Sequence, residues 1–289
     1  MAVAFDTPAT RFDPAPPQTA SGLRVAGGWA VGAPARLGAR PAASTLEAVQ
    51  TLARRYPASL RAEQLADAAR IASHVERILR PGASVADLGG GIGLFSPSCA
   101  ALGMEAWLVD DFGDPVSRSF DLDDIGLHRP LGVRIVETPL QRWGEAFGDE
   151  CLDVVTCFDS LEHWHHSPRA VFAEAYRALK PGGSLLISGP NAVNLRKRLT
   201  VPFGRSNWSR FEDWFYPEQF RGHVREPVLA DLIRLVRELG FEKQAVWGRN
   251  WAGYPANGLR RVPAWLIDHA LRPFPTLCSD LYVLARKPD

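Results

Sequence analysis

Four glycines occupy five consecutive positions in the stretch "GGGIG" at residues 89–93. The residues before it, 84–88, form a short apolar run typical of a strand, and residues 93–102 have the spacing of a helix. Glycine is disfavoured in both elements, so a cluster between them indicates a tight turn or a close approach of the backbone to a ligand. A strand, a glycine turn and a helix in this order present backbone N–H groups to an anionic part of that ligand.

Short apolar runs alternate with helical patterns over the rest of the chain. We predict seven strands, at 84–88, 105–109, 132–136, 152–157, 184–188, 242–247 and 280–285. We predict helices at 59–79, 93–102, 139–147, 167–179 and 227–239. This alternation is typical of a parallel sheet with helices on both faces, so the predicted fold class is α/β with a doubly wound sheet.

Composition and charge exclude several classes of partner. The chain has 289 residues, enough for one large domain, and its formal net charge of +1 argues against nucleic acid as the main partner. Its four cysteines are scattered without a C-x-x-C pair, and the N-terminus lacks the pattern of a signal peptide, so we expect a cytoplasmic protein. Residues 1–44 lack an apolar period and predict a flexible leader before a domain at 45–289.

The glycine pattern separates two classes of cofactor. A dinucleotide site would require G-x-G-x-x-G, but Leu94 stands where the last glycine would be. The stretch instead reads D-x-G-x-G-x-G, which resembles motif I of class I S-adenosylmethionine-dependent methyltransferases. The resemblance continues in "EAWLVDD", "LDVVTCFDSLEH" and "RALKPGGSLLISGPN", in this order and with the expected spacing. "GHVREP", followed by a helix and "LGF", resembles the subgroup of ubiquinone-type O-methyltransferases.

The resemblance covers about residues 80–250 and, weakly, the last predicted strand. It implies a Rossmann-like sheet of seven strands, mostly parallel with an antiparallel last strand, and S-adenosylmethionine as cofactor. Asp87 would lie near the ammonium of the cofactor's methionine part, and Asp110 would accept hydrogen bonds from the ribose hydroxyls. Asp111 is the rival for that second role. The complete predicted cofactor set is Asp87, Gly89, Gly90, Gly91, Gly93, Asp110, Asp111 and Phe158. After the third strand, Glu137 and Gln141 match the expected adenine-binding acid poorly, so no adenine contact is assigned.

Methyl transfer to an oxygen or nitrogen acceptor requires a group that removes a proton. The stretch "FDSLEHWHH" follows the fourth predicted strand and offers several titratable side chains. His163 is the first choice, because a neutral imidazole near pH 7 accepts a hydroxyl proton. Glu162 and His223 complete the predicted catalytic set.

The same stretch allows a metal alternative. Asp159, Glu162 and His163 form D-x-x-E-H, similar to the E-x-x-E-H with which ubiquinone-type O-methyltransferases are thought to hold a divalent ion. Such an ion would lower the pKa of an acceptor hydroxyl. A second alternative is that Glu162 and His163 only brace the adjoining helix. A divalent metal is therefore possible but is not part of the predicted site.

Residues 190–225 are too long for a simple connection and carry basic residues early and aromatic residues late. We predict a lid whose aromatic side chains contact the acceptor, with His223 and Arg225 as polar anchors. The alternative is that these aromatic side chains form a small core under a long loop. Near 262–275, Trp265, Leu266 and His269 indicate an amphipathic helix; packing before the last strand is favoured over contact with a membrane.

The sequence as a whole predicts a methyltransferase that acts on the oxygen, or less readily the nitrogen, of a small molecule. Two alternatives stay open: a module that binds the cofactor without catalysis, and a nicotinamide-dependent oxidoreductase, which Leu94 disfavours. Neither the acceptor nor the oligomeric state is encoded in these motifs, because loops determine acceptor choice on a shared fold.

Overall fold

The computed structural model describes residues 42–113, 122–206, 208–218, 220–251 and 261–289, all of which belong to the compact unit Val31–Asp289. The predicted leader therefore lies almost wholly outside the described residues. Its last two positions open a helix, α2 (Ala43–Arg55), which was not predicted.

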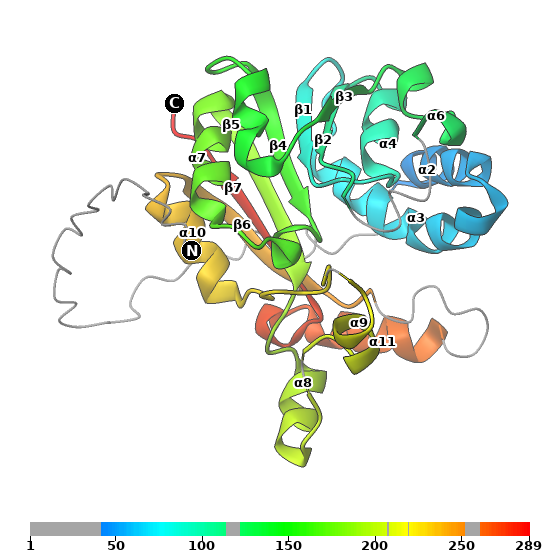
Figure 1. Cartoon of the computed structure of the whole chain (residues 1–289), viewed down its shortest axis with the longest axis vertical. Helices are drawn as coiled ribbons and strands as arrows, with labels where there is room; N and C mark the ends of the chain where they lie inside the picture. Colours follow the sequence, from blue (N-terminus) through cyan, green and yellow to red (C-terminus); the bar gives the residue numbers. More distant parts are fainter. Residues whose placement is uncertain (1–41, 114–121, 207, 219, 252–260) are drawn as a thin grey trace, which may run out of the picture. The chain divides into compact units, whose positions relative to one another are not determined.

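Seven strands form one sheet in the order β3-β2-β1-β4-β5-β7-β6 (Figure 1). Their bounds are β1 (Ser84–Leu88), β2 (Glu105–Asp110), β3 (Arg134–Glu137), β4 (Leu152–Phe158), β5 (Leu179–Pro190), β6 (Glu242–Arg249) and β7 (Asp280–Arg286). Neighbours from β3 to β5 pair in parallel, and β7 is antiparallel to both β5 and β6. The predicted fold class, including the antiparallel last strand, is confirmed.

The order of the strands reverses between β1 and β4. From β1 the chain proceeds outward through β2 to β3, and it then returns to place β4 on the other side of β1. Ligands of doubly wound sheets bind in the crevice that such a reversal leaves at the carboxyl ends of the strands. The glycine stretch directly follows β1, so it stands at this crevice.

Helices cover both faces of the sheet (Figure 1). One face packs against α2, α3 (Ala58–Ile78) and α4 (Phe95–Ala101), and the other packs against α7 (Pro168–Ala178) and α10 (Leu229–Glu238). Consecutive residues of one strand enter opposite clusters: Val154 packs on the first face and Val155 on the second. This explains why the strands read as unbroken apolar runs in the sequence.

One predicted helix has a different form. Residues 139–147 were expected to be an α-helix, but they contain the 3₁₀ helix η2 (Leu140–Ala146). Trp143 determines its packing, because this side chain is fully buried and its Nε1 donates to the carbonyl of Val171 at 3.1 Å. The segment forms this short 3₁₀ helix packed against α7, and 3₁₀ helices are usually short.

Beyond the carboxyl end of β5 the chain forms α8 (Leu195–Thr200), the 3₁₀ helix η4 (Val201–Phe203) and α9 (Phe211–Phe215) before α10. The remaining short elements are α6 (Leu122–Ile125), η1 (Arg129–Leu131), η3 (Leu161–His163) and η6 (Pro275–Leu277).

The helix predicted near 262–275 is α11 (Arg261–Leu271). A buried carboxylate holds this helix against β6. Asp268 of the helix accepts hydrogen bonds from Arg249, Arg272 and the backbone N–H of Asn250. Its Trp265 and Leu266 are instead exposed. Among the described residues, no helix combines the length and the apolar character needed to cross a membrane.

Candidate active site

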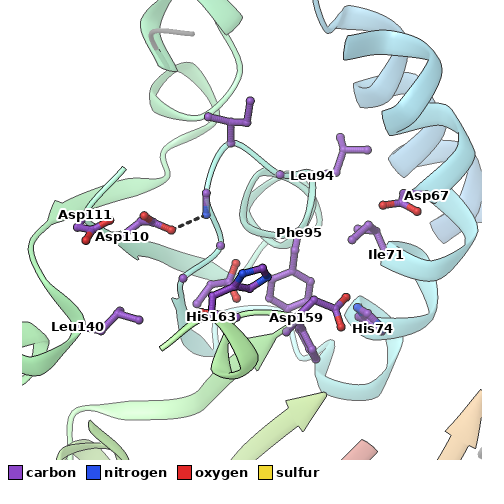
Figure 2. A pocket seen from close by; sticks show the side chains of 18 of the residues that line it. Asp67, Ile71, His74, Leu94, Phe95, Asp110, Asp111, Leu140, Asp159 and His163 are labelled. Carbon is purple, nitrogen blue, oxygen red and sulfur yellow. Dashed lines mark hydrogen bonds between the residues drawn. The ribbon is translucent and has the colours of Figure 1, made fainter. Parts of the chain in front are cut away.

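A cleft of about 690 Å³ opens at the carboxyl ends of β1, β2 and β4 (Figure 2). Every residue of the predicted cofactor set lines it: Asp87, Gly89, Gly90, Gly91, Gly93, Asp110, Asp111 and Phe158. His163 also lines the cleft, together with Asp159, His165 and His166 from the same predicted stretch. The structure thus gathers the residues that the sequence indicated along 80 positions of the chain into one cavity.

Two of the glycines are required by neighbouring side chains. A Cβ atom on Gly89, whose φ is +73°, would lie 1.9 Å from Oγ of Ser160. A Cβ atom on Gly90 would lie 2.2 Å from Oδ2 of Asp87. Because neither position has room for a side chain, the turn brings bare backbone to the edge of the cleft.

Asp87 is a buried carboxyl at the floor of the cleft, with 3% of its surface exposed. Its Oδ1 accepts from Oγ1 of Thr156 at 2.8 Å, and its Oδ2 accepts from Oγ of Ser96 at 3.1 Å. Desolvation raises the pKa of Asp87 to about 7, although both hydrogen bonds favour the charged form. A cationic group placed in the cleft would favour the ionised carboxylate, as the sequence prediction for an ammonium requires.

Asp110 and Asp111 both lie at the end of β2, but they make different contacts. Oδ2 of Asp110 accepts from the backbone N–H of Gly91 at 2.9 Å, drawn as a dashed line in Figure 2, and its Oδ1 accepts from Phe112 N–H at 2.7 Å. Oδ1 of Asp111 accepts from the N–H of Gly113, at 2.7 Å. Asp110 therefore joins the second strand to the glycine turn, which sequence reasoning did not foresee.

One wall of the cleft comes from α3, which was predicted as a helix without any role in the site. Residues of one helical face line the cavity: Leu60, Glu63, Gln64, Asp67, Arg70, Ile71 and His74. Arg70 donates to Asp67 at 2.6 Å and also contacts Asp159, which follows β4. Helical spacing alone gives no signal for this role, because the polar side chains of α3 read as the solvated face of an amphipathic helix.

Aromatic rings close the base of the cleft. Phe158 stacks on His74 with ring centroids 4.3 Å apart and meets Phe95 edge-on at 4.8 Å. Nε2 of His74 lies 2.9 Å from the hydroxyl of Tyr282. Burial, followed by three nearby arginines, lowers the pKa of His74 well below its usual value, so this ring is neutral.

After β3, Leu140 and Gln141 line the cleft. Glu137, the last residue of β3, is not among the lining residues. The sequence assigned no adenine contact here. Gln141 is thus the polar side chain from this segment that reaches the cavity.

The predicted catalytic residues Glu162, His163 and His223 come together, with one donor atom of each within 4.8 Å of the others. Nδ1 of His163 lies 2.8 Å from the carbonyl of Arg221, and Nδ1 of His223 lies 2.9 Å from Oε1 of Glu226. The two imidazole rings meet edge-on at 4.8 Å. A carbonyl only accepts hydrogen bonds, so this contact places a proton on Nδ1 of His163.

Glu162 is 1% exposed, and its Oε2 has no hydrogen-bond partner among the described residues. Desolvation and then the charge of Asp159 raise the pKa of Glu162 to about 8. Burial, then His163 and Lys197, lower the pKa of His223, so its imidazole is neutral at pH 7. The site therefore holds one buried carboxyl beside the neutral imidazole of His223.

The candidate metal ligands in the structure differ from the predicted D-x-x-E-H set by one residue. Asp159 is engaged by Arg70, and His223 from a distant loop takes the third place beside Glu162 and His163. A free buried carboxyl oxygen and two imidazoles, each with its Nδ1 hydrogen-bonded, fit a divalent ion. The same set also fits the transfer of a proton.

A second cavity of about 550 Å³ adjoins this cluster and is mostly apolar. It is lined by His165, Ser206, Trp208, Ser209, Phe211, Trp214, Phe220, His223 and Val224. Trp208 and Trp214 are 74% and 60% exposed, so these rings do not form a buried core under the loop. Arg225, predicted as an anchor, pairs instead with Asp231 at 2.9 Å and lines neither cavity.

Comparison with known proteins identifies the family. Residues 61–246, about two thirds of the chain, match a family model described as a methyltransferase domain. The chain belongs to the class I S-adenosylmethionine-dependent methyltransferases. The cofactor of this methyltransferase is S-adenosylmethionine, and nothing supports the alternative of a nicotinamide-dependent oxidoreductase.

Curated relatives of the methyltransferase include two ubiquinone biosynthesis O-methyltransferases. The protein from Hahella chejuensis is 35% identical over 116 residues, which cover 40% of this chain and 47% of that protein. The protein from Burkholderia pseudomallei is 29% identical over 170 residues, which cover 58% of this chain and 68% of that protein. The match thus spans about half the length of the first relative.

Solved structures share the fold at low identity. An S-adenosylmethionine-dependent methyltransferase from Mesorhizobium loti superposes with a TM-score of 0.53 at 16% identity, covering 78% of this chain and 99% of that chain. One from Archaeoglobus fulgidus superposes with a TM-score of 0.50 at 18% identity, covering 78% of this chain and 94% of that chain.

Proposed function

We propose that this methyltransferase transfers the methyl group of S-adenosylmethionine to a hydroxyl oxygen of a small molecule that carries an apolar or aromatic ring. The cofactor occupies the cleft at the glycine turn, and the acceptor's ring occupies the second cavity. The observation that carries the proposal is that the two cavities meet at three histidines, a place we call the junction. His165 lines both cavities, and His163 of the first is in ring contact with His223 of the second.

The chemistry at this junction is a single displacement. The acceptor oxygen attacks the methyl carbon of the sulfonium as the S–CH₃ bond breaks, and the bonding electrons pass to sulfur. The hydroxyl proton passes to an imidazole of the cluster. The products are a methyl ether, S-adenosylhomocysteine and a protonated histidine. The protein's main contribution is alignment, because the sulfonium methyl is already activated.

Oxygen is favoured over nitrogen as the acceptor atom by two features. The curated relatives are O-methyltransferases by name. A neutral hydroxyl also needs a base, and His163 and His223 are present at the junction. A divalent ion held by Glu162, His163 and His223 would lower the pKa of the hydroxyl when bound, and it is an alternative to unaided proton transfer. A cytoplasmic location, and the absence of nucleic acid and membranes among the partners, stay predictions from the sequence.

The test has two stages. Calorimetric titration of the purified protein with S-adenosylhomocysteine should show binding, and titration with NADH should show none. A panel of phenols and matched anilines, offered with radiolabelled S-adenosylmethionine, should then give methyl transfer to phenols first. Absence of S-adenosylhomocysteine binding at millimolar concentration would refute the cofactor site. Binding without transfer to any acceptor would favour a module that binds the cofactor without catalysis.

A further inference from the structure

Three charged or titratable side chains form a chain of contacts behind the junction. Lys197 of α8 contacts Oε2 of Glu226 through its Nζ, and Oε1 of Glu226 lies 2.9 Å from Nδ1 of His223. Lys197 and Glu226 are 29 positions apart in the sequence and stand at opposite ends of the predicted lid. The contact thus joins the start of the lid to the loop that carries His223.

Burial sets this ion pair apart from others in the same region. The side chains of Lys197 and Glu226 are 8% and 14% exposed, whereas those of Arg225 and Asp231 next to them are 77% and 43% exposed. A buried ion pair is often no more stabilising than apolar residues of the same size, because both charges lose their water. Stability alone is therefore a weak reason for this pair, and its geometry suggests another.

Backbone contacts hold both ends of the pair. Oδ1 of Asn194 accepts from the N–H of Lys197 at 3.0 Å at the start of α8, and the N–H of Ala192 donates to the carbonyl of Pro227 at 3.1 Å. The N–H groups of Val224 and Arg225 donate to the carbonyl of Glu162 at 2.7 and 3.1 Å. The carboxylate of Glu226 therefore stands at a fixed place relative to Glu162 and the imidazole of His223.

The carboxylate determines which ring nitrogen of His223 carries the proton. An ionised carboxylate only accepts hydrogen bonds, so Nδ1 of the neutral ring must be the protonated nitrogen. Nε2, on the opposite edge of the ring, then keeps its lone pair. A third group that orients a base in this way recurs in sites where histidine removes a proton from a hydroxyl.

We propose that Glu226 and Lys197 are positioning residues of the methyltransferase: Glu226 holds His223 as the Nδ1–H tautomer, and Lys197 holds the carboxylate of Glu226 in place. His223, which lines the acceptor cavity, then offers Nε2 to the acceptor hydroxyl. His163 has only a backbone carbonyl at its Nδ1, so it lacks an orienting charge. This inference rests on the proposed function for its kinetic consequence, but the tautomer itself can be measured without any ligand.

The first readout is the tautomer in ligand-free protein. Histidine is labelled with ¹⁵N, long-range ¹H–¹⁵N spectra are recorded, and His223→Ala assigns the resonance among the seven histidines. We expect Nδ1–H in the wild type and in Glu226→Gln, whose amide oxygen still accepts, and a shift toward Nε2–H in Glu226→Ala. Glu238→Ala, which removes a glutamate from an exposed pair with Arg234, is the matched control and should leave the spectrum unchanged.

The second readout is kinetic, with the phenol that gives the highest turnover. Glu226→Ala should lower kcat by roughly 10–100-fold with little change in the acceptor's KM, and Glu226→Gln should restore much of the loss. If Glu226→Ala leaves Lys197 unpaired and the protein does not fold, Lys197→Met/Glu226→Ala replaces it. An unchanged tautomer, or a kcat that does not fall when the tautomer changes, overturns the proposal. Should S-adenosylhomocysteine fail to bind the wild type, the proposed function fails while the spectra still decide the role of Glu226.

Discussion

Asp110 and Asp111 are adjacent carboxylates, and Asp110 was favoured for the ribose contact because it directly follows the apolar run of the strand. Asp110 is the last residue of β2 and Asp111 follows it, and both line the cleft. Only Asp110 contacts the glycine turn, through Gly91, while Asp111 contacts its own loop at Gly113. The difference arises from the register of β1 and β2, which pairs Leu88 with Val109 and so brings the next residue beside the turn.

We predict that Asp110→Ala weakens the binding of S-adenosylhomocysteine by at least about tenfold. The variant loses a charge-assisted hydrogen bond to the turn and the predicted contact to the ribose, and each such bond contributes roughly 1.5–3 kcal/mol. Calorimetric titration measures the dissociation constant. Asp111→Ala is the matched control, and its expected change is smaller. Equal losses in the two variants would show that the turn contact is unimportant for the cofactor.

The cluster of Glu162, His163 and His223 leads to a prediction about metal. We expect turnover to be retained in excess EDTA, since transfer of a proton to a neutral imidazole needs no ion. Turnover is measured in chelator and again after addition of Mg²⁺ or Zn²⁺. Loss of activity in EDTA with recovery on addition of one ion would instead assign the cluster as a metal site.

At the scale of elements, the strands could be predicted almost completely and the walls of the site only in part. All seven strands were found because buried strands read as apolar runs, and the largest difference is β5, which begins at Leu179 rather than 184. There Leu179 already pairs with Leu152 of β4, and the "KPGG" stretch, expected to end a helix, lies in an irregularity of the strand before Ser184 pairs with Val154. Local turn residues gave no sign of this tertiary pairing.

Residues that act across elements could not be predicted. The face of α3 that lines the cleft was missed because helical spacing identifies a face but not what lies opposite it. The contact of Glu226 with Lys197 was missed for the same reason, since nothing in the sequence relates positions 29 residues apart across a lid. Conversely, His163 and His223 were both named from their residue type, and their ring contact could only be seen in the structure.

The lid provides a prediction at this scale. Trp214 of α9 lines the acceptor cavity and is 60% exposed, so we expect Trp214→Ala to raise the acceptor's KM by roughly tenfold with almost no change in melting temperature. Phe274→Ala, at an aromatic residue that is 58% exposed and lines neither cavity, is the control for loss of an exposed ring. A fall in melting temperature at constant KM would make Trp214 a structural residue.

Across the whole molecule, burial at the site should make folding depend on pH. Besides Asp280, whose pKa is raised to about 6, two carboxyls have pKa values raised chiefly by desolvation, Glu162 to about 8 and Asp87 to about 7. In the unfolded chain both titrate near their usual values, so above about pH 5 the folded state holds protons that the unfolded state has released. Stability from these two groups is fully present below the unfolded pKa values and is lost as pH rises through the folded ones.

Buried histidines change the free energy of unfolding in the opposite direction, but at lower pH. Burial lowers the pKa of His128 to about 4 and that of His74 well below its usual value. Their contribution therefore rises with pH and levels off about one unit above the unfolded pKa of about 6.5. Between pH 6.5 and 8 the two carboxyls therefore dominate. We expect the ligand-free protein to lose on the order of 2 kcal/mol of unfolding free energy over this range, or about 5 °C in melting temperature.

Glu162→Gln separates the two carboxyls, because the amide keeps the shape of the side chain but does not titrate. Thermal unfolding at several pH values should show a flatter profile in this variant, with the remaining slope due to Asp87. Glu212→Gln, at an exposed position, should keep the wild-type slope. Bound S-adenosylmethionine should also flatten the profile, because an ammonium at its predicted place beside Asp87 would favour the ionised carboxylate. A wild-type melting temperature that rises from pH 6.5 to 8 would mean that neither carboxyl is protonated in the folded protein.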